Sequence, residues 1–415
     1  MKLDFLKAQN FRNIENADLS FSDGVNLLYG KNGAGKTNAL EAIYLFAICK
    51  SFRTNKDSDF IMHGKEKSDI TIGFSSAFSK QDERSKKMGI TFFPSDKKRL
   101  TYESVGISKI SEFVGRFRAV FFTPDHLSLI KGSPEERRRF ADMALSQIKP
   151  SYIHCLNEYS RILSQRNSLL KKAKLQGEYD KDLLYVYSES LAASAAIITK
   201  QRAYFAEYLE KEAASFYKEI SGQKEQLFIR YLSSEKEDPK DPEKTKERYL
   251  SLYTSNVENE IKYGSTKYGP HKDDLLFYIG KNGRCDSFFD EESEKSCECD
   301  GDGCDIVSDF DDCEKKKEKN MIEFAARTFA SQGQQRSAVL SLKLAEGEII
   351  KGLTGEYPVY LFDDVLSELD NQRKSHLLSL FSDKQVIITC CDENSFDNGL
   401  VNNKIRVENG SYFKE

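Results

Sequence analysis

The stretch Gly30-Lys31-Asn32-Gly33-Ala34-Gly35-Lys36-Thr37 decides the fold, because it fits the phosphate-binding pattern G-x-x-x-x-G-K-[ST]. It follows an apolar run at 25–29 and opens a helical pattern whose apolar face holds Leu40, Ile43, Tyr44 and Ala47. This strand–loop–helix order is the context that the motif needs. The glycines let backbone N–H groups surround the phosphates, while Lys36 reaches the β- and γ-phosphates and Thr37 binds Mg²⁺. The loop therefore predicts nucleotide binding.

A second segment, much later in the chain, supports this prediction. The apolar run Pro358-Val359-Tyr360-Leu361-Phe362 leads directly into Asp363-Asp364. A buried strand that ends in two carboxylates suits nucleotide hydrolysis, since one carboxylate holds Mg²⁺ or its water and the other orients the attacking water. The two segments together predict a magnesium-dependent site that binds and hydrolyses a nucleoside triphosphate.

Composition places the chain among ordinary globular proteins. It has 415 residues, of which 39% are hydrophobic and 31% charged, so two domains or one large interrupted domain are expected. No apolar run approaches the roughly 20 residues of a membrane-spanning helix. The start, Met1-Lys2-Leu3-Asp4, does not resemble a signal peptide, which predicts a cytoplasmic location without a membrane partner. Nine cysteines in a chain of this length indicate reduced thiols.

The formal net charge of −4 is unevenly distributed. Between Cys285 and Lys319 there are 14 Asp and Glu residues against 5 Lys, a local charge of −9 that leaves +5 on the remainder. The rest of the chain is therefore mildly basic. Net charge neither supports nor excludes a nucleic-acid partner.

The order of apolar patterns predicts an α/β fold with a helical insertion. Strand-like runs occur at 3–8, 17–21, 25–29, 70–74, 89–93, 119–122, 275–279 and 385–389. From Glu135 to about Lys262 the spacing is helical, with few Pro or Gly residues. We expect an ATPase head formed by residues 1–123 and 265–415, interrupted by a mainly α-helical lobe at 124–264. The acidic, cysteine-bearing segment 285–319 is too polar to build a core and is expected to be a loop.

A second anion-binding pattern precedes the acidic strand. Ala330-Ser331-Gln332-Gly333-Gln334-Gln335-Arg336-Ser337 leads into a helical pattern, so its hydroxyl and exposed N–H groups would lie at the positive end of a helix. One chain cannot easily place both anion sites on the same phosphate. A two-fold dimer can, if the loop of one subunit and Ser331 of the other enclose the same γ-phosphate.

The motifs, taken in order, resemble the RecF family, bacterial recombination mediators among the ABC-type ATPases that are related to SMC heads. The likeness spans nearly the whole chain apart from the acidic segment, and the short helical insertion does not suit the long-armed relatives. It rests on these stretches: Phe11-Arg12-Asn13, Gly35-Lys36-Thr37-Asn38, Leu40-Glu41-Ala42-Ile43-Tyr44, Ser51-Phe52-Arg53-Thr54, Lys131-Gly132-Ser133-Pro134, Arg137-Arg138-Arg139-Phe140, Gly269-Pro270-His271-Lys272-Asp273-Asp274-Leu275, Ser331-Gln332-Gly333-Gln334-Gln335-Arg336 and Leu361-Phe362-Asp363-Asp364-Val365-Leu366-Ser367-Glu368-Leu369-Asp370.

The resemblance implies an SMC-head-like P-loop ATPase that dimerises with ATP and has a weak, DNA-stimulated ATPase activity. It implies binding to single- and double-stranded DNA at gap junctions, and cooperation with RecO and RecR in loading RecA. By position, Asp363 would be the magnesium carboxylate and Asp364 the catalytic, water-activating acid beside Lys36. Ser331, Gln332, Gly333 and Gln334 would form the signature that meets ATP in the partner subunit.

The chain departs from the ABC pattern in two places. Thr389-Cys390-Cys391-Asp392 stands where ABC proteins usually have a histidine. RecF-like chains tend to have Thr there, so the hydroxyl of Thr389 is the expected replacement. A Q-loop glutamine is also absent from the stretch 121–127.

Several features keep more than one interpretation at this stage. Arg137-Arg138-Arg139 at a helix start either grips phosphate or forms a solvated face, and Arg53 would contact ATP or DNA. His271 is expected to be structural rather than part of the ATPase site. The five cysteines of the acidic segment match neither a zinc nor a calcium site, which favours a loop without metal over a metal-binding one. A transporter ATPase subunit and an ATPase-linked nuclease are the competing functions, and the motif order disfavours both.

Overall fold

The computed structural model describes most of the chain: residues 1–51, 53–54, 56–76, 85–95, 97–222, 225–234, 239–282, 321–365, 379–393, 399 and 401–414. The acidic segment 285–319 and the stretch 367–370, both singled out in the sequence, lie outside these residues.

A six-stranded, mainly parallel sheet forms the centre of the head, in the order β15-β14-β3-β13-β12-β8. Strands β14, β3, β13, β12 and β8 run parallel, and β15 pairs antiparallel with β14. Every residue of β3, β8, β12 and β13 is buried, which explains their largely apolar sequences. The strands are β3 (Val25–Tyr29), β8 (Ala119–Phe122), β12 (Val359–Asp363), β13 (Val386–Cys390), β14 (Asn403–Glu408) and β15 (Ser411–Lys414).

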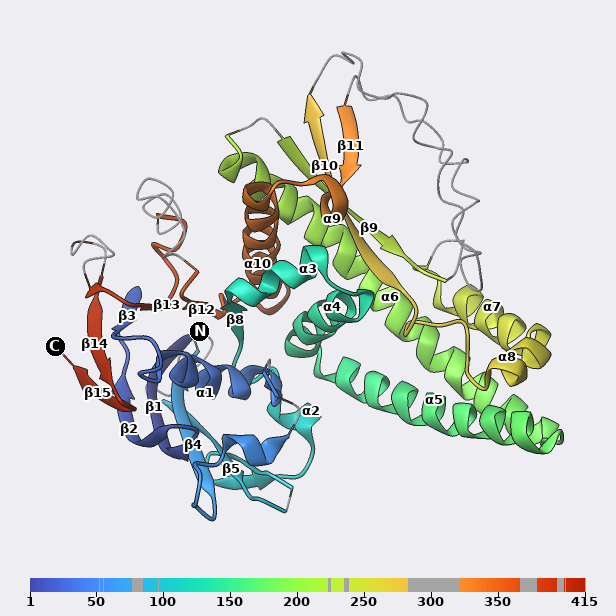
Figure 1. Ribbon diagram of the computed structural model, residues 1–415, viewed down its shortest axis with the longest axis horizontal. Helices are drawn as coiled ribbons and strands as arrows, with labels where there is room; N and C mark the ends of the chain where they lie inside the picture. The colour runs from blue at the N-terminus through green and yellow to red at the C-terminus, as the bar shows by residue number, and fades with distance from the viewer. Residues whose placement is uncertain are drawn as a thin grey trace.

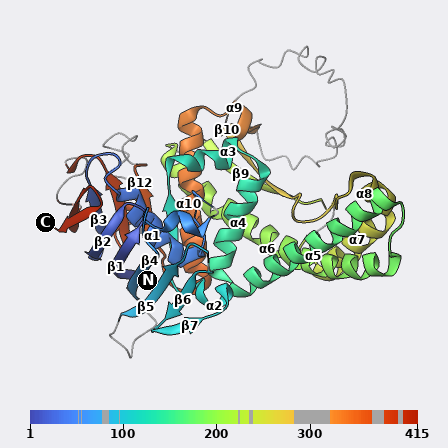
Figure 2. The ribbon, with the colours of Figure 1, turned by 60° about the horizontal axis from the view of Figure 1, so that its bottom comes forward.

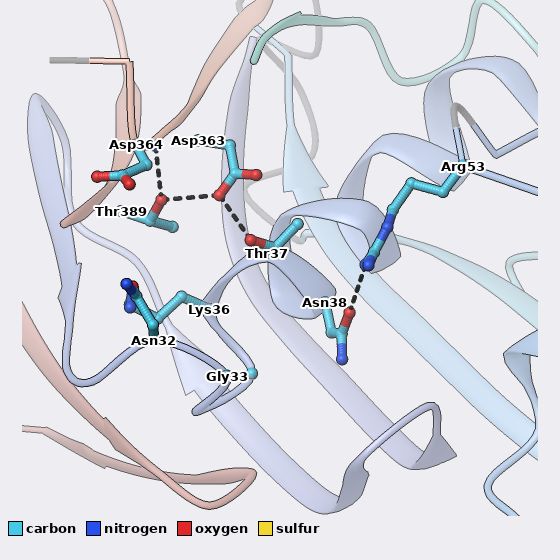
Figure 3. A pocket seen from close by; sticks show the side chains of 10 residues that line it. Asn32, Gly33, Lys36, Thr37, Asn38, Arg53, Asp363, Asp364 and Thr389 are labelled. Atoms are coloured by element: carbon cyan, nitrogen blue, oxygen red, sulfur yellow. Dashed lines mark hydrogen bonds between the residues drawn. The ribbon is translucent and has the colours of Figure 1, made fainter. Parts of the chain in front are cut away.

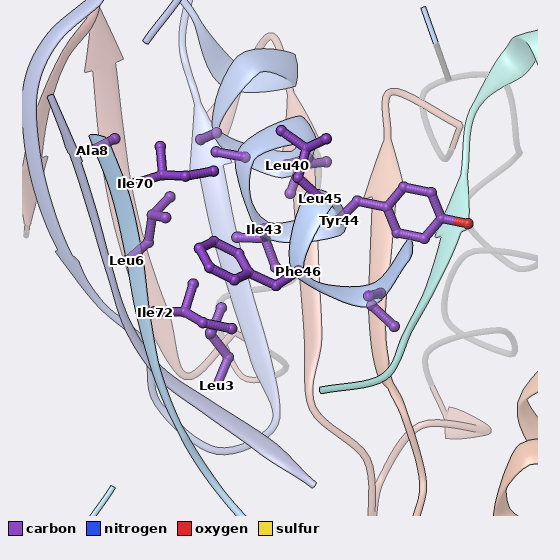
Figure 4. Close-up of a cluster of buried hydrophobic side chains, with 14 of the residues drawn as sticks. Leu3, Leu6, Ala8, Leu40, Ile43, Tyr44, Leu45, Phe46, Ile70 and Ile72 are labelled. Carbon is purple, nitrogen blue, oxygen red and sulfur yellow. The ribbon is translucent and has the colours of Figure 1, made fainter. Parts of the chain in front are cut away.

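A second, antiparallel sheet lies on the other side of helix α1 (Lys36–Ile48), as Figure 1 shows. Its strands, in spatial order, are β2 (Ile14–Ser20), β1 (Lys2–Phe11), β4 (Ser68–Ser75), β5 (Lys86–Phe92), β6 (Arg99–Tyr102) and β7 (Val105–Ile107). Eleven residues of α1 are buried, because both sheets pack against it. Figure 4 shows Ile43 and Phe46 of α1 directed toward Leu6 and Ile72 of this sheet.

A largely helical lobe extends from the head, with the long helices α5 and α6 reaching a tip formed with α7 and α8 (Figures 1 and 2). A three-stranded antiparallel sheet, in the order β11-β10-β9, packs beside α6. The elements here are α3 (Ser128–Lys131), α4 (Pro134–Ile148), α5 (Pro150–Gln176), α6 (Lys181–Ile220), β9 (Glu225–Leu232), α7 (Pro242–Ser255), α8 (Val257–Tyr263), β10 (Asp274–Asn282) and β11 (Met321–Ala325). The remaining ones are η1 (Asp57–Phe60), α2 (Ile110–Phe113), η2 (Pro124–Leu127), α9 (Ala326–Phe329) and α10 (Gln332–Thr354).

The expectation of helix throughout 135–262 is wrong at β9. Leu227 and Ile229 alternate with less buried residues and face the core, while the backbone pairs with β10. The pairing also joins 274–282, which the sequence assigned to the head, to a strand of the predicted lobe. The proposed domain limits at 123/124 and 264/265 stay a prediction.

No helix in the described residues combines the length and the apolar character needed to cross a membrane.

Candidate nucleotide-binding site

A cleft of about 270 Å³ lies where α1, β12 and β13 meet at the carboxyl edge of the central sheet. Ten residues line it: Asn32, Gly33, Gly35, Lys36, Thr37, Asn38, Arg53, Asp363, Asp364 and Thr389. Figure 3 shows how loop residues and carboxylates from distant parts of the sequence face one another across this cleft. Ligands of open α/β sheets bind at this edge.

The phosphate-binding loop is supported by the strands around it. Gly30 has a φ of 152°, and a Cβ there would lie 2.2 Å from the carbonyl oxygen of Val407 in β14. Gly35 has a φ of 114° and precedes the first residue of α1. The hydroxyl of Tyr412 in β15 donates to the Gly35 carbonyl (3.0 Å). Two of the loop glycines are therefore required by backbone geometry and close packing.

The loop fits a phosphate group. The backbone N–H groups of Asn32, Gly33 and Gly35 donate to no acceptor in the described part of the chain, and they lie at the positive end of α1. The buried Lys36 ammonium donates to the carbonyl oxygens of Gly30 (2.6 Å) and Lys31 (3.0 Å). Backbone donors and one cation thus lie together in one loop at a helix N-terminus, an arrangement that suits anion binding.

A chain of hydrogen bonds connects the loop with the acidic strand. The Thr37 hydroxyl donates to Asp363 Oδ1 (2.8 Å), and the Thr389 hydroxyl donates to the same oxygen (2.9 Å). The Asp364 N–H in turn donates to Thr389 Oγ1 (3.0 Å). Burial raises the pKa of Asp363, and the hydrogen bond from Thr37 opposes this shift. A divalent cation here would favour the charged carboxylate and offset the cost of its burial.

Thr389, the expected replacement for the histidine of ABC proteins, therefore lies in this corner of the cleft. Its hydroxyl connects the Asp363 carboxylate with the Asp364 N–H. Thr389 belongs to β13, whereas Asp363 is the last residue of β12 and Asp364 follows it. Asp364 has a φ of 53°, an uncommon value outside glycine, which turns the chain sharply at the end of β12.

Glu41 is a residue of this region that sequence reasoning did not assign to the site. Its side chain is almost fully buried, and both carboxylate oxygens accept from Arg12, at 2.6 and 2.8 Å. The Ser51 hydroxyl also donates to it (2.5 Å). Arg53 lines the cleft and donates to Asn38 Oδ1 (3.0 Å). A lone glutamate inside an apolar helix was the available signal, because a buried carboxylate needs partners.

The signature residues do not line the cleft of their own chain. Ser331 caps the N-terminus of α10, and Ser331, Gln332 and Gly333 are exposed. Gly333 has no positive φ, and a Cβ at this position would meet nothing within 4 Å. The described chain thus gives no internal reason for a glycine at 333.

The arginine run contacts protein groups. Arg137 forms a buried, two-bond pair with Asp274 (2.7 Å each), Arg138 donates to the Asp273 carbonyl (2.7 Å), and Arg139 donates to the Ser51 carbonyl (2.6 Å). Each arginine of the run therefore has a partner within the fold, and Arg139 reaches the segment next to Arg53.

His271 also lies apart from the cleft lining. Its Nδ1 shares a hydrogen bond with the Tyr159 hydroxyl (2.6 Å), and Nε2 approaches the Thr266 carbonyl (3.2 Å). These bonds hold the 269–274 segment against α5.

Comparison with known proteins agrees with this arrangement. The family model described as the RecF/RecN/SMC N-terminal domain matches residues 2–412. The DNA replication and repair protein RecF of Listeria innocua is 39% identical over 404 residues, covering 96% of this chain and 95% of that protein. RecF of Staphylococcus carnosus is 35% identical over the full length of both. The chain belongs to the RecF family.

Solved structures show that the RecF fold is shared. The recombination mediator protein RecF-ATP of the RecFOR pathway superposes with a TM-score of 0.83 at 31% identity, covering 100% of this chain and 97% of that one. An Smc head domain from Pyrococcus furiosus gives a TM-score of 0.52 at 17% identity, a likeness of fold alone. This RecF-family chain therefore has the α/β, SMC-head-like P-loop fold expected from the sequence, together with a helical lobe.

Proposed function

We propose that this RecF-family chain is an ATP-dependent DNA-binding protein of recombinational and replication-gap repair. The observation that carries the proposal is the hydrogen bond between Thr37 and Asp363, which brings the phosphate loop to an acidic strand end. A relative of the same fold is described as RecF-ATP, which supports ATP as the nucleotide.

Different residues of the cleft would bind the phosphates, hold Mg²⁺ and accept the proton during ATP hydrolysis. The backbone of Gly30–Thr37 would hold the phosphates, with Lys36 exchanging its carbonyl partners for the β- and γ-phosphate oxygens. Thr37 and Asp363 would hold Mg²⁺, which neutralises charge on the transferred phosphoryl group. Asp364 would accept a proton from the attacking water, and Thr389 would hold Asp364 and Asp363 in register.

The signature of a second copy would complete each site. Ser331, Gln332 and Gly333 are exposed, and the large apolar Phe329 just before them is 70% exposed. A glycine with open space above it allows close approach from outside the chain. Both copies can offer this face at once in a two-fold dimer. ATP would have to favour the closed dimer by about 5.5 kcal/mol to move it from 1% to 99% of the population.

DNA is the proposed partner of this dimer. We propose weak ATPase activity stimulated by DNA, binding at junctions of single- and double-stranded DNA, and cooperation with RecO and RecR in loading RecA in the cytoplasm. Support comes from the family and from relatives named DNA replication and repair proteins. Slow turnover would suit a switch that marks DNA rather than a motor that moves along it.

Two measurements test the proposal. Sedimentation with and without a non-hydrolysable ATP analogue should show a dimer only with the analogue, and an unchanged mass would contradict it. ATPase rates should be compared on gapped, duplex and single-stranded DNA.

Lys36→Arg and Asp364→Asn should each abolish turnover, while Asp364→Asn should still bind ATP. Turnover that responds to a membrane partner instead of DNA would favour a transporter subunit.

A further inference from the structure

We infer that Glu225 positions the signature loop for the partner's nucleotide, and that Gln334 is part of this positioning device rather than a nucleotide contact. The inference rests on the proposed ATP-driven dimer and assigns roles within it. It differs from the sequence expectation, in which Gln334 meets ATP.

Both ends of the Gln334 amide are occupied within its own chain. Its Oε1 accepts from the Ser331 N–H (2.7 Å), and its Nε2 donates to Glu225 Oε1 (2.8 Å). Its backbone N–H donates to Ser331 Oγ (3.3 Å). One end of the Gln334 amide therefore holds the loop backbone at Ser331, and the other end holds Glu225.

Glu225 is held in turn by the helical lobe. It is the first residue of β9, and its Oε2 accepts from the hydroxyl of Tyr217 in α6 (2.9 Å). The Tyr217 side chain is fully buried, and its pKa is raised by burial and by the hydrogen bond to Glu225. A carboxylate fixed by two donors from different elements is a rigid anchor. The start of α10 is thus tied to the α6–β9 corner.

This anchor leaves Ser331 ready for an outside acceptor. A serine hydroxyl can accept and donate at once. Ser331 Oγ accepts from the Gln334 N–H, while its own proton has no acceptor among the described residues. The exposed hydroxyl can therefore donate to a phosphate oxygen that a second copy brings.

A simpler view is that Glu225 only stabilises the helix. A carboxylate near a helix N-terminus is favourable, and the capping box alone satisfies two N–H groups. That view predicts lower stability on removing Glu225, with no specific loss of dimerisation. Exchanging the residue types of Glu225 and Gln334 distinguishes a positioning role of Glu225 from a purely stabilising one.

The experiment uses the full chain with Glu225→Gln, Gln334→Glu and the double exchange. In the double variant, the carboxylate introduced at position 334 can accept from the Ser331 N–H and from the new amide at position 225, whose oxygen still accepts from Tyr217. The measured quantities are the dimer dissociation constant with a non-hydrolysable ATP analogue, analogue affinity at concentrations where the chain is monomeric, and the unfolding midpoint. Gln226→Ala, the next residue of β9, is the matched control.

Each single exchange should weaken the dimer about tenfold, because it loses a charge-assisted hydrogen bond or opposes two carboxylates. Monomer affinity for the analogue should be unchanged, and the double exchange should restore the dimer. Tyr217→Phe, which removes one oxygen atom, should give a smaller loss in the same direction. Gln226→Ala should behave as the wild type.

Three outcomes would overturn the inference. A double exchange as defective as Gln334→Glu alone would mean that Gln334 contacts nucleotide directly. Single exchanges that lower the unfolding midpoint but leave the dimer intact would reduce Glu225 to a stabilising role. A wild-type chain that stays monomeric with the analogue would defeat the proposed function itself, which the other two outcomes leave standing.

Discussion

At the scale of single residues, the cleft depends on one hydroxyl group. Thr389 Oγ1 connects Asp363 Oδ1 with the Asp364 N–H and is itself buried. The Thr37 hydroxyl donates to the same oxygen of Asp363, so the two hydroxyls together hold the orientation of this carboxylate. A small polar residue thus contacts the carboxylate of Asp363 and the backbone of Asp364 at once.

Thr389→Val should lower both stability and turnover. Valine has nearly the same shape but leaves the Asp364 N–H without this acceptor, so we expect about 1–3 kcal/mol lower free energy of unfolding. Turnover should fall by an order of magnitude or more, because Asp364 loses its fixed direction. Urea unfolding and steady-state ATPase assays measure the two effects. Thr389→Ser keeps the hydroxyl and should stay near the wild type, and an equally impaired serine variant would contradict this role.

His271 should make stability depend on pH. Burial, with nearby Lys272 and Arg138, lowers its pKa from 6.5 to about 4, against an opposing hydrogen bond to Thr266. Between about pH 6.5 and 4, His271 is therefore protonated in the unfolded chain but not in the folded chain. The free energy of unfolding should fall as pH drops through this range. Urea unfolding across this range should give a flatter profile for His271→Gln than for the wild type.

The control for this prediction is His154, which is exposed on α5. His154→Gln should keep the wild-type pH profile. A His271→Gln profile as steep as the wild type would assign the pH dependence to other groups.

At the residue scale, the sequence predicted the motif residues but not their supports. The cleft lining includes Lys36, Thr37, Asp363 and Asp364, all of which were expected there. These residues lie in short motifs whose local backbone places them. Glu41 was missed because its partners, Arg12 and Ser51, come from the turn between β1 and β2 and from the segment after α1, which only the folded chain brings together.

At the scale of elements, the start of α10 carries a glycine that its own chain does not need. Gly333 lies in the first turn with a negative φ and open space where a Cβ would stand. Glycine in a helix costs about 1 kcal/mol relative to alanine. A cost without internal benefit indicates a benefit outside the chain.

Gly333→Ala should therefore act in opposite directions on stability and assembly. We expect a free energy of unfolding that is unchanged or up to about 1 kcal/mol higher. Dimerisation with an ATP analogue should be lost, because the methyl group occupies the space of the partner's phosphates. Gly352→Ala is the control, since Gly352 is exposed in the same helix and has the same open space. It should raise stability without affecting the dimer, and a dimer that survives Gly333→Ala would contradict the role of this turn.

Elements with strong local patterns were predicted well, and those that depend on distant pairing were not. Strands β3, β12 and β13 are confirmed, because runs buried on both faces have little alternative. Strand β9 was predicted as helix, since it sits among helices and only its pairing with β10 decides its conformation. Strand pairing across two intervening helices cannot be predicted from the residues within a short stretch of sequence.

At the scale of the whole molecule, the proposed dimer should double the DNA contact. A two-fold axis gives DNA two copies of every basic surface, so the number of neutralised phosphates should about double when the dimer closes. The logarithmic salt slope of DNA affinity, near −0.9 per phosphate, should then about double with an ATP analogue present. Binding titrations between low and high salt measure it. Equal slopes with and without the analogue would mean that DNA meets one copy only.

The pairing of β3 with both β13 and β14 has a consequence for synthesis on the ribosome. The strand that leads into the phosphate loop is translated early, yet both of its neighbours belong to residues 386–408, and Gly410 and Tyr412 brace the loop as well. A nascent or prematurely terminated polypeptide would carry the complete loop sequence without a working cradle. A growing chain would thus not bind nucleotide until the last strands have been translated. Incomplete chains would therefore not sequester ATP.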